Sequence, residues 1–234
     1  MRKHSRISPL SIGLLVVSTS AFAAPVKDDW SMWLSNTYQT DFGDSPYLAF
    51  LELAPRTKHD NGEFSQVIVR PLLGYKLTQK LQLWLGYTWQ GEYSKETDFE
   101  LATNDFMQQL QWIDNWTPQL NFQYRFRMEE RFFEGEDTAF RMRHRFRFVY
   151  SLPETNTYLI AADELFVYFN SINHGRLAGS VQPGINQNRS YVGIGYKLTL
   201  KINIDTGYQF QYVNNFGAQD GANHIWLTNL NVNF

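Results

Sequence analysis

Apolar and polar residues alternate along most of this chain, from about residue 30 to its end. Alternation with a period of two is typical of β-strands that are apolar on one face and polar on the other. The pattern therefore predicts an all-β protein with eleven strand-like segments. They are 30–40, 46–57, 64–77, 80–93, 104–114, 119–133, 138–152, 156–170, 187–199, 201–214 and 223–234.

Most of these segments are long for a soluble sheet, in which strands average about 5–6 residues. About 9–11 residues suffice for a tilted barrel strand to cross a bilayer. Short turns, as at Gly43–Ser45 and Thr78–Gln79, alternate with longer links. Outer-membrane barrels have this arrangement, with the short turns in the periplasm. We therefore expect a closed antiparallel, up-and-down transmembrane β-barrel. The longer links are 58–63, 94–103, 134–137, 171–186 and 215–222.

The number of strands is constrained by parity, because bacterial barrels have an even number. If all eleven segments crossed the membrane in alternating directions and the last one ended in the periplasm at Phe234, the first segment, 30–40, would have to start outside the cell. We therefore expect ten strands within residues 46–234, with residues 24–45 as a non-spanning N-terminal segment. The alternative is a barrel of twelve strands, with a hidden strand inside 171–186.

The first residues resemble a secretory signal peptide. Arg2, Lys3 and Arg6 are followed by a short, interrupted apolar run and by the small-residue pattern Ala21-Phe22-Ala23. This order of basic, apolar and small residues predicts export and cleavage after Ala23. Residues 1–23 are therefore expected to be absent from the mature chain.

Composition narrows the class of protein further. Aromatic residues make up 16% of the chain and there is no cysteine, so disulfides and thiolate metal sites are excluded. Loss of residues 1–23 would leave 18 basic against 23 acidic residues. A net negative chain is not a general nucleic-acid-binding surface. We expect no cofactor, no metal site and no nucleic-acid partner.

The last segment indicates which face meets lipid. Trp226, Leu230, Val232 and Phe234 share one side, and asparagines occupy the other. In a membrane barrel the apolar side faces lipid and the polar side faces the lumen. Phe234 at the end of such a strand resembles the signal read by the barrel-assembly machinery. Tyrosines and tryptophans near strand ends suit the aromatic girdles at the membrane interfaces.

The segments 119–133 and 138–152 carry rows of arginine that alternate with rings and methionine. An arginine that faces lipid at the bilayer centre costs about 2–4 kcal/mol, so four on one face would cost on the order of 10 kcal/mol. We therefore expect these side chains to face the lumen. The charged residues expected there are Arg125, Arg127, Glu129, Arg131, Arg141, Arg143, Arg145, Arg147, Arg189 and Asp205.

Buried charges need partners of opposite sign. Glu52, Arg70, Asp163 and Glu164 are the candidate lumen partners on other strands. Asp163 and Glu164 are adjacent, so strict alternation sends one of them outward. The sequence leaves open which one, and we expect that one to lie at a bulge or near a rim.

Several motifs together resemble domain-of-unknown-function family 2490. They are Arg127-Met-Glu129-Glu-Arg131-Phe, Arg141-Met-Arg143-His-Arg145-Phe-Arg147, Asp163-Glu164-Leu-Phe, Asn188-Arg189 before Gly193-Ile-Gly195-Tyr, and Asn223-His224. The resemblance covers most of the chain after residue 30. It implies a barrel in the outer membrane of a Gram-negative bacterium, in contact with lipids and lipopolysaccharide. It supplies no catalytic or substrate-binding residues.

Three functions remain open at this point. The charged rows could be a salt-bridged interior that fills a narrow barrel, which we favour because such a lumen is just filled by side chains. They could instead line a narrow pore that prefers anionic solutes, as charged rings do in channels. A lipid-modifying enzyme is the third alternative, prompted by His144 among outward rings. We expect no enzyme, because no nucleophile and base are recognisable together.

Overall fold

The computed structural model describes residues 26–95, 98–133, 137–172, 181–216 and 219–234. Within these ranges the chain forms eleven strands and no helix, and nothing there is a helix long and apolar enough to cross a membrane. The strands are β1 (Lys27–Asp41), β2 (Tyr47–Lys58), β3 (Glu63–Lys76), β4 (Leu81–Ser94), β5 (Asp98–Asn115), β6 (Leu120–Phe133), β7 (Ala139–Ser151), β8 (Thr157–Tyr168), β9 (Gly184–Lys197), β10 (Ile202–Val213) and β11 (Gly221–Asn233).

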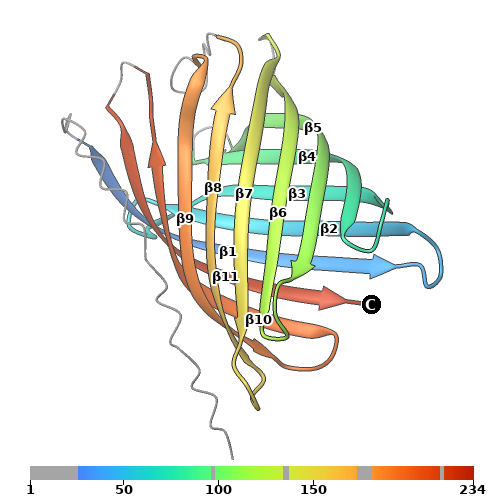
Figure 1. Ribbon diagram of the computed structural model, residues 1–234. Coiled ribbons are helices and arrows are strands. Elements are labelled where there is room, and N and C mark those ends of the chain that lie inside the picture. The colour runs from blue at the N-terminus through green and yellow to red at the C-terminus, as the bar shows by residue number, and fades with distance from the viewer. Residues whose placement is uncertain (1–25, 96–97, 134–136, 173–180, 217–218) are drawn as a thin grey trace, which may run out of the picture.

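The all-β prediction is confirmed, and each strand lies close to a predicted segment. The largest difference is at β5, which begins at Asp98 rather than at residue 104. The predicted closed, up-and-down barrel is also confirmed, because each strand pairs with its neighbours in the chain and the sheet closes on itself (Figure 1).

The barrel closes through a parallel ladder between β1 and β11, from the pair Lys27–Gly221 to the pair Gln39–Asn233. All other neighbouring strands are antiparallel. The prediction of ten antiparallel strands is therefore wrong. With an odd number of alternating strands, the first and last run in the same direction, so they can meet only as a parallel pair.

The N-terminal segment 24–45 is not separate from the barrel. Its strand β1 pairs with β2 on one side and with β11 on the other, so the barrel begins at Lys27 and not at residue 46. The hidden strand of the twelve-strand alternative falls mostly on residues 173–180, outside the described residues; where the chain is described, β8 pairs directly with β9. In the described part of that link, Ile172 and Val181 form an isolated bridge. The predicted signal peptide, residues 1–23, lies outside the described residues.

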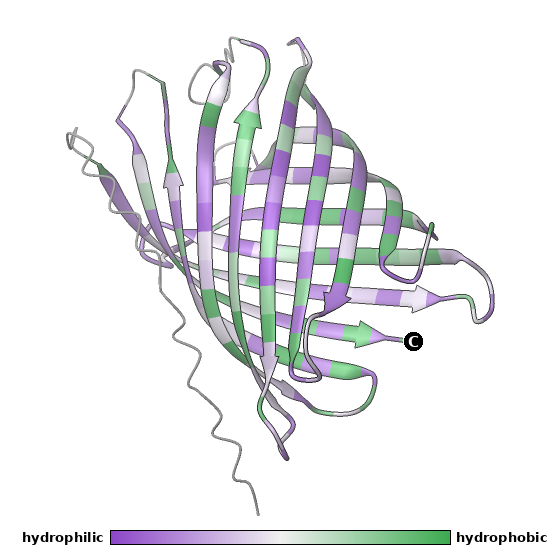
Figure 2. Ribbon diagram, in the orientation of Figure 1, coloured by the Kyte–Doolittle hydropathy of each residue, from purple (hydrophilic) through white to green (hydrophobic). Residues whose placement is uncertain are grey.

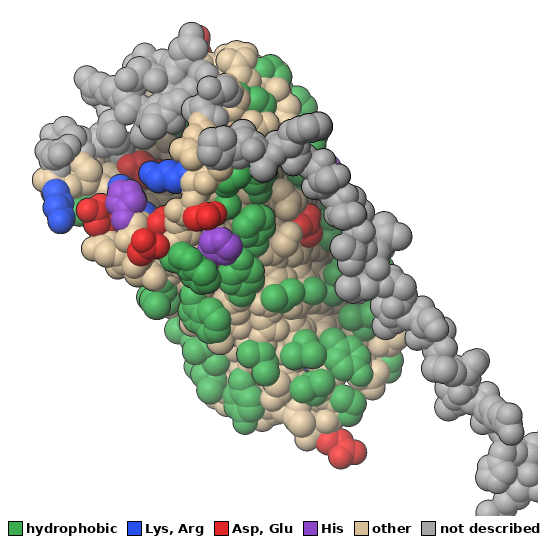
Figure 3. Space-filling model, turned by 90° about the vertical axis from the view of Figure 1, so that its left-hand side faces the viewer, with side chains coloured by type: hydrophobic (Ala, Val, Ile, Leu, Met, Phe, Trp, Pro, Cys, Tyr) green, Lys and Arg blue, Asp and Glu red, His purple; other side chains and the backbone are tan. Residues whose placement is uncertain are grey.

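The wall of the barrel has its apolar residues outside and many of its charged residues inside. Leu73 is 72% exposed and Val192 is 59% exposed, whereas Arg127 is 2% and Glu129 is 1% exposed. Figure 2 shows the alternation of hydrophilic and hydrophobic residues along the strands. In the face that Figure 3 shows, hydrophobic side chains cover the wall, and most of the visible charged side chains gather near one end. Arginine and glutamate are almost never fully buried in soluble proteins unless they are paired.

Close packing inside the barrel depends on glycine at one point of β9. A Cβ at Gly195 would collide with the ring of Tyr158, and one at Gly193 would collide with Tyr191. Both tyrosines are buried and pack together with Ile160. These two glycines therefore make room for inward-facing rings. The apolar side chains of Leu48, Leu72, Trp84 and Met107 form a second cluster inside the wall.

Candidate functional site

The charged interior is built on the hairpin of β6 and β7. In its antiparallel register Arg127 lies opposite Arg143, Glu129 lies opposite Arg141, and Arg125 lies opposite Arg145. Because side chains alternate along a strand, these odd-numbered residues all face the same side. The structure places every arginine of the two rows inside the barrel, where each lines one of two cavities.

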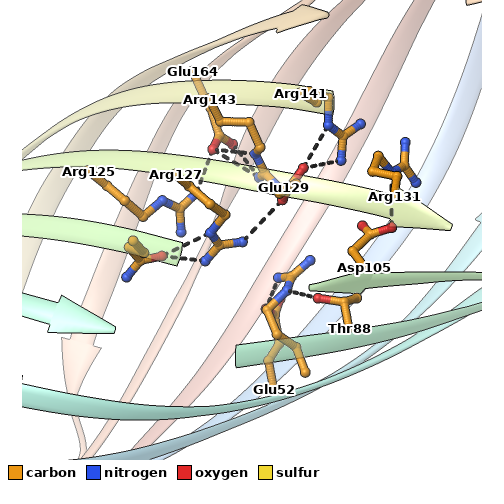
Figure 4. Close-up of polar contacts among 12 residues, drawn as sticks. Glu52, Thr88, Asp105, Arg125, Arg127, Glu129, Arg131, Arg141, Arg143 and Glu164 are labelled. Carbon is orange, nitrogen blue, oxygen red and sulfur yellow. Dashed lines mark hydrogen bonds and ion pairs between the residues drawn. The ribbon is translucent and has the colours of Figure 1, made fainter. Parts of the chain in front are cut away.

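Glu129 is the centre of the first cluster (Figure 4). Its Oε2 accepts a hydrogen bond of 2.7 Å from Arg141 Nε, and its Oε1 accepts one of 2.8 Å from Arg143 Nη1. Arg127 Nη1 lies 3.7 Å from the same Oε1. One carboxylate therefore compensates arginines on both strands of the hairpin.

Glu164 of β8 is the centre of the second cluster. Arg143 binds it with two parallel hydrogen bonds, Nε to Oε1 and Nη2 to Oε2, each 3.0 Å long. Arg125 also donates to Oε1. Such bidentate pairs combine charge with a fixed geometry. Arg143 thus joins Glu129 to Glu164 and is the link between the two clusters.

Asp163 faces outward, which corrects its assignment as a candidate lumen partner. It accepts hydrogen bonds from Ser190 Oγ at 2.7 Å and from Asn188 Nδ2 at 3.0 Å. Both partners lie on the outer face of β9, since Arg189 between them faces the lumen. The pairing of β8 is regular at Asp163, and its register shifts only between Phe166 and Val167. The expectation that the outward residue lies at a bulge or a rim was therefore wrong.

Polar side chains of other strands complete the network. Arg131 Nε donates to Asp105 of β5 at 3.1 Å, and Arg131 Nη1 donates to the Tyr168 hydroxyl at 2.8 Å. Gln109 Oε1 accepts from both Nε and Nη2 of Arg127, at 2.9 and 2.6 Å. The network therefore extends along the inner wall from β5 to β8.

Glu52 and Arg70 form a separate ion pair on β2 and β3. Arg70 also donates from Nε to Thr88 Oγ1 at 3.0 Å, and Ser35 Oγ donates to Glu52 at 3.1 Å. Asp205 lies inside the barrel as well, but its partners are neutral. It accepts from the Tyr191 hydroxyl at 3.1 Å and from Nδ2 of Asn229 and Asn231 at 2.7 and 3.1 Å.

A stack of guanidinium groups and rings connects strands on opposite sides of the lumen. Arg143 lies 4.4 Å from the ring centroid of Phe166, and Arg189 lies 4.7 Å from that ring and 5.0 Å from the ring of Trp33. Arg56 also stacks on Trp33, at 3.7 Å from its ring centroid. The stack therefore runs from β7 through β8, β9 and β1 to β2. We call it the cross-lumen stack.

The interior holds two cavities, one toward each end of the barrel. The larger has a volume of about 720 Å³ and reaches residues beside the short turns, among them Asn115 and Ser151. The smaller, of about 310 Å³, reaches residues beside the long links, such as Lys58 and Asn186. Arg143, Arg189, Trp33 and Arg56 line both cavities. The cross-lumen stack therefore stands between them.

Sequence reasoning missed several residues of this interior, among them Trp33, Arg56, Asp105 and Phe166. Asp105 could have been found, because it alternates with Met107 and Gln109 on the inner face of β5 and lies opposite Arg131. Trp33 and Phe166 carried no such signal, since an aromatic residue on a barrel strand suggests a lipid-facing position.

Outside the barrel, His144 faces outward as predicted, and its Nδ1 lies 2.7 Å from the Tyr124 hydroxyl. Ser190 is two strands away and is hydrogen-bonded to Asp163. Among the residues that the structure describes, no three His, Asp or Glu side chains gather where they could hold a metal ion.

The backbone nitrogen of Phe234 donates to the carbonyl oxygen of Gln39 in β1 at 2.9 Å, so the chain end adjoins the parallel ladder between β1 and β11.

Comparison with known proteins gives a family but no assigned activity. A family model described as "Protein of unknown function (DUF2490)" matches residues 30–222. An uncharacterized protein of Methylorubrum extorquens is 27% identical over 237 residues, and the alignment covers the whole of both chains. No solved structure matches.

Proposed function

The chain belongs to this family of proteins of unknown function, and we propose that it is an outer-membrane β-barrel of a Gram-negative bacterium whose lumen is closed by its charged network. The single observation that carries the proposal is the reversal of polarity across the wall. Paired arginines and glutamates are buried inside, and large apolar side chains are exposed outside. A surface of this kind is stable where the outer solvent is lipid.

The large apolar side chains exposed on the outer wall support the proposal that lipid surrounds the barrel. Leu85, Phe106, Phe146, Val192 and Ile194 are all exposed and belong to four different strands. An apolar surface of this extent is rare on soluble monomers. Closure of the barrel also leaves no open edge, which a sheet in hydrocarbon requires. The N-terminal segment with its cleavage pattern is consistent with export.

The proposed place in the outer membrane also implies which molecules the barrel contacts. The outer wall would contact membrane lipids and lipopolysaccharide, and Phe234 would be read by the barrel-assembly machinery during insertion. The charged network would then hold the wall together from within. A carboxylate shared by arginines of neighbouring strands links those strands in addition to their backbone ladders.

A narrow pore that prefers anions is the second candidate function. The observation that favours it is the excess of arginine around the larger cavity, where eight arginines lie among the lining residues. Rings of one charge select ions of the opposite charge in channels. The cross-lumen stack favours the closed lumen over this alternative, because it separates the two cavities.

Conductance in planar bilayers distinguishes the two candidates. Wild-type protein, shown to be inserted by its resistance to protease, is expected to give no stepwise conductance. The double variant Arg143→Ala/Glu164→Ala removes the bidentate pair that joins the two clusters, together with the arginine of the cross-lumen stack on β7, and it should produce conductance steps. It also leaves Arg125 without its carboxylate partner. Phe146→Ala, outward on the same strand, is the matched control and should behave as wild type. Stable anion-selective steps from the wild type would contradict the closed lumen.

A further inference from the structure

The larger cavity has the size and position of a binding chamber. Its volume of about 720 Å³ lies within the range of about 300–1,000 Å³ that is usual for small-molecule sites. Lys197, Asn203 and Asn233 line it near the short turns, so the chamber adjoins that end of the barrel. A molecule that enters from this end would meet the cross-lumen stack as the floor of the chamber.

The lining of the chamber is strongly cationic. Eight arginines and Lys197 line it, against four carboxylates, of which Asp163 faces outward and is hydrogen-bonded to Ser190 and Asn188. Three carboxylates therefore face inward. All three carboxylates already have partners: Glu52 binds Arg70, Glu164 binds Arg143 and Arg125, and Asp205 accepts three hydrogen bonds from neutral groups. None of them remains for further arginines. The arginines of the lining are Arg56, Arg70, Arg125, Arg127, Arg143, Arg145, Arg147 and Arg189.

Four of these arginines have no ion pair within the described residues. Arg56 donates to Gln66 and stacks on Trp33, and Arg189 stacks on Trp33 and Phe166. The other two, Arg145 and Arg147, make neither a side-chain hydrogen bond nor an ion pair there, so their charges are left uncompensated. They lie two residues apart on the inner face of β7, and Arg145 lies directly opposite Arg125 in the ladder. Like charges that face each other across a ladder are destabilising. A negative group between these side chains would remove that repulsion.

Two donors on the neighbouring strand β6 are also unused. Arg125 Nε and Arg127 Nη1 are buried and make no hydrogen bond, although Arg127 Nη1 lies 3.7 Å from Glu129. Buried donors are nearly always satisfied in folded proteins, by the chain, by water or by a ligand. Both arginines belong to the same wall of the chamber as Arg145 and Arg147. The wall formed by β6 and β7 therefore has both uncompensated charge and unused donors.

We propose that the chamber binds a phosphate-bearing amphiphile, with its phosphate group held by Arg145 and Arg147. A phosphate monoester carries up to about two negative charges and three strong acceptor oxygens. One such group would compensate both free guanidinium groups at once, and guanidinium forks bind phosphate with paired hydrogen bonds. A carboxylate brings only one charge and would leave the other arginine uncompensated.

Another part of the chamber wall indicates what the rest of the ligand would be. Phe50, Leu72 and Trp84, from β2, β3 and β4, line the same chamber, and Phe50 and Trp84 are in edge contact with ring centroids 6.3 Å apart. A chamber with a basic wall and an apolar wall fits a molecule with an anionic head and an apolar body. This inference goes beyond the closed lumen proposed above and holds wherever the barrel is embedded.

Titration calorimetry of the full mature chain in a nonionic detergent tests the proposal. The probes are 1-naphthyl phosphate, a soluble aromatic phosphate, and lysophosphatidic acid, a lipid phosphate, with uncharged 1-naphthol as the comparison. Saturable binding of at least one phosphate probe is expected, and 1-naphthol should bind at least about tenfold more weakly. Tighter binding of lysophosphatidic acid would identify a lipid headgroup as the source, and tighter binding of 1-naphthyl phosphate a soluble one.

The double variant Arg145→Gln/Arg147→Gln should lower the affinity for the phosphate probe at least about tenfold. Its fold should be preserved, because the substitutions remove a repulsion and break no ion pair. Lys80→Gln is the matched control: it removes a charge at the same end of the barrel, where Lys80 pairs with Asp114 at 2.8 Å outside the chamber. It should bind as wild type does. Equal binding by the double variant, or no saturable binding of either phosphate probe, would overturn the proposal.

Discussion

At the scale of single residues, the interior is stable because most of its charges share partners. Glu129 is almost fully buried and receives hydrogen bonds from Arg141 and Arg143. Desolvation of each charge is costly, and a buried pair repays that cost only when its geometry and hydrogen bonds are good. Removal of the shared carboxylate would leave Arg141 without its carboxylate partner and Arg143 with Glu164 alone.

Glu129→Gln is therefore expected to destabilise the barrel by about 3–5 kcal/mol, the usual cost of breaking a buried ion pair. Urea unfolding of the refolded protein in lipid vesicles measures the change. Glu130→Gln is the matched control, because Glu130 is the next residue of β6 and faces outward, and it should change stability by no more than about 0.5 kcal/mol. Equal effects of the two substitutions would show that Glu129 does not stabilise the interior.

The charged face of β6 and β7 could be predicted from sequence, but the orientation of Asp163 and Glu164 could not. On β6 and β7 the two faces differ sharply, since arginine alternates with phenylalanine and methionine. On β8 both faces carry apolar residues: Leu165 and Val167 lie outside, whereas Phe166 and Tyr168 lie inside. Alternation alone gives no preferred face for such a strand. Only the contacts with Arg143 identify Glu164 as the inward residue.

At the scale of elements, strand positions were predictable and the closure of the barrel was not. Turn residues and long alternating runs mark the ends of each strand in the sequence itself. Pairing of β1 with β11 is made by backbone hydrogen bonds between segments almost a full chain apart. The side chains of β1 give no sequence signal that β11 is its pairing partner. The assumption of an even strand number therefore excluded a strand that the alternation had found.

Deletion of residues 26–45 tests whether β1 is a necessary part of the wall. Without it β2 and β11 would each expose an unpaired edge, which is unfavourable in hydrocarbon. The truncated chain should lose the shift in electrophoretic mobility on heating that folded barrels show in detergent. The point variant Asn36→Ala keeps the backbone ladder of β1 and should retain that shift. A truncated chain that still folds and shifts would mean that ten strands suffice.

At the scale of the whole molecule, the arrangement is a wall with lipid-compatible residues outside, a charged layer within, and a cavity on either side of that layer. The strand pattern predicts this type of barrel, and the exposed apolar wall agrees with it. Burial of paired charge together with exposure of apolar side chains is the arrangement that the proposed membrane location requires.

The most direct test of this claim uses two single-cysteine variants, because the natural chain has no cysteine. Val192→Cys faces outward, and Gln209→Cys faces the lumen at the same height, since β9 and β10 pair Val192 with Tyr208 and Tyr191 with Gln209. Each is labelled with a fluorophore and reconstituted into vesicles that contain nitroxide-labelled lipid. If the outer wall lies in lipid, we expect strong quenching by the nitroxide-labelled lipid at position 192 and little at position 209. Quenching of the label at 192 by aqueous iodide, with none by the nitroxide lipid, would contradict it.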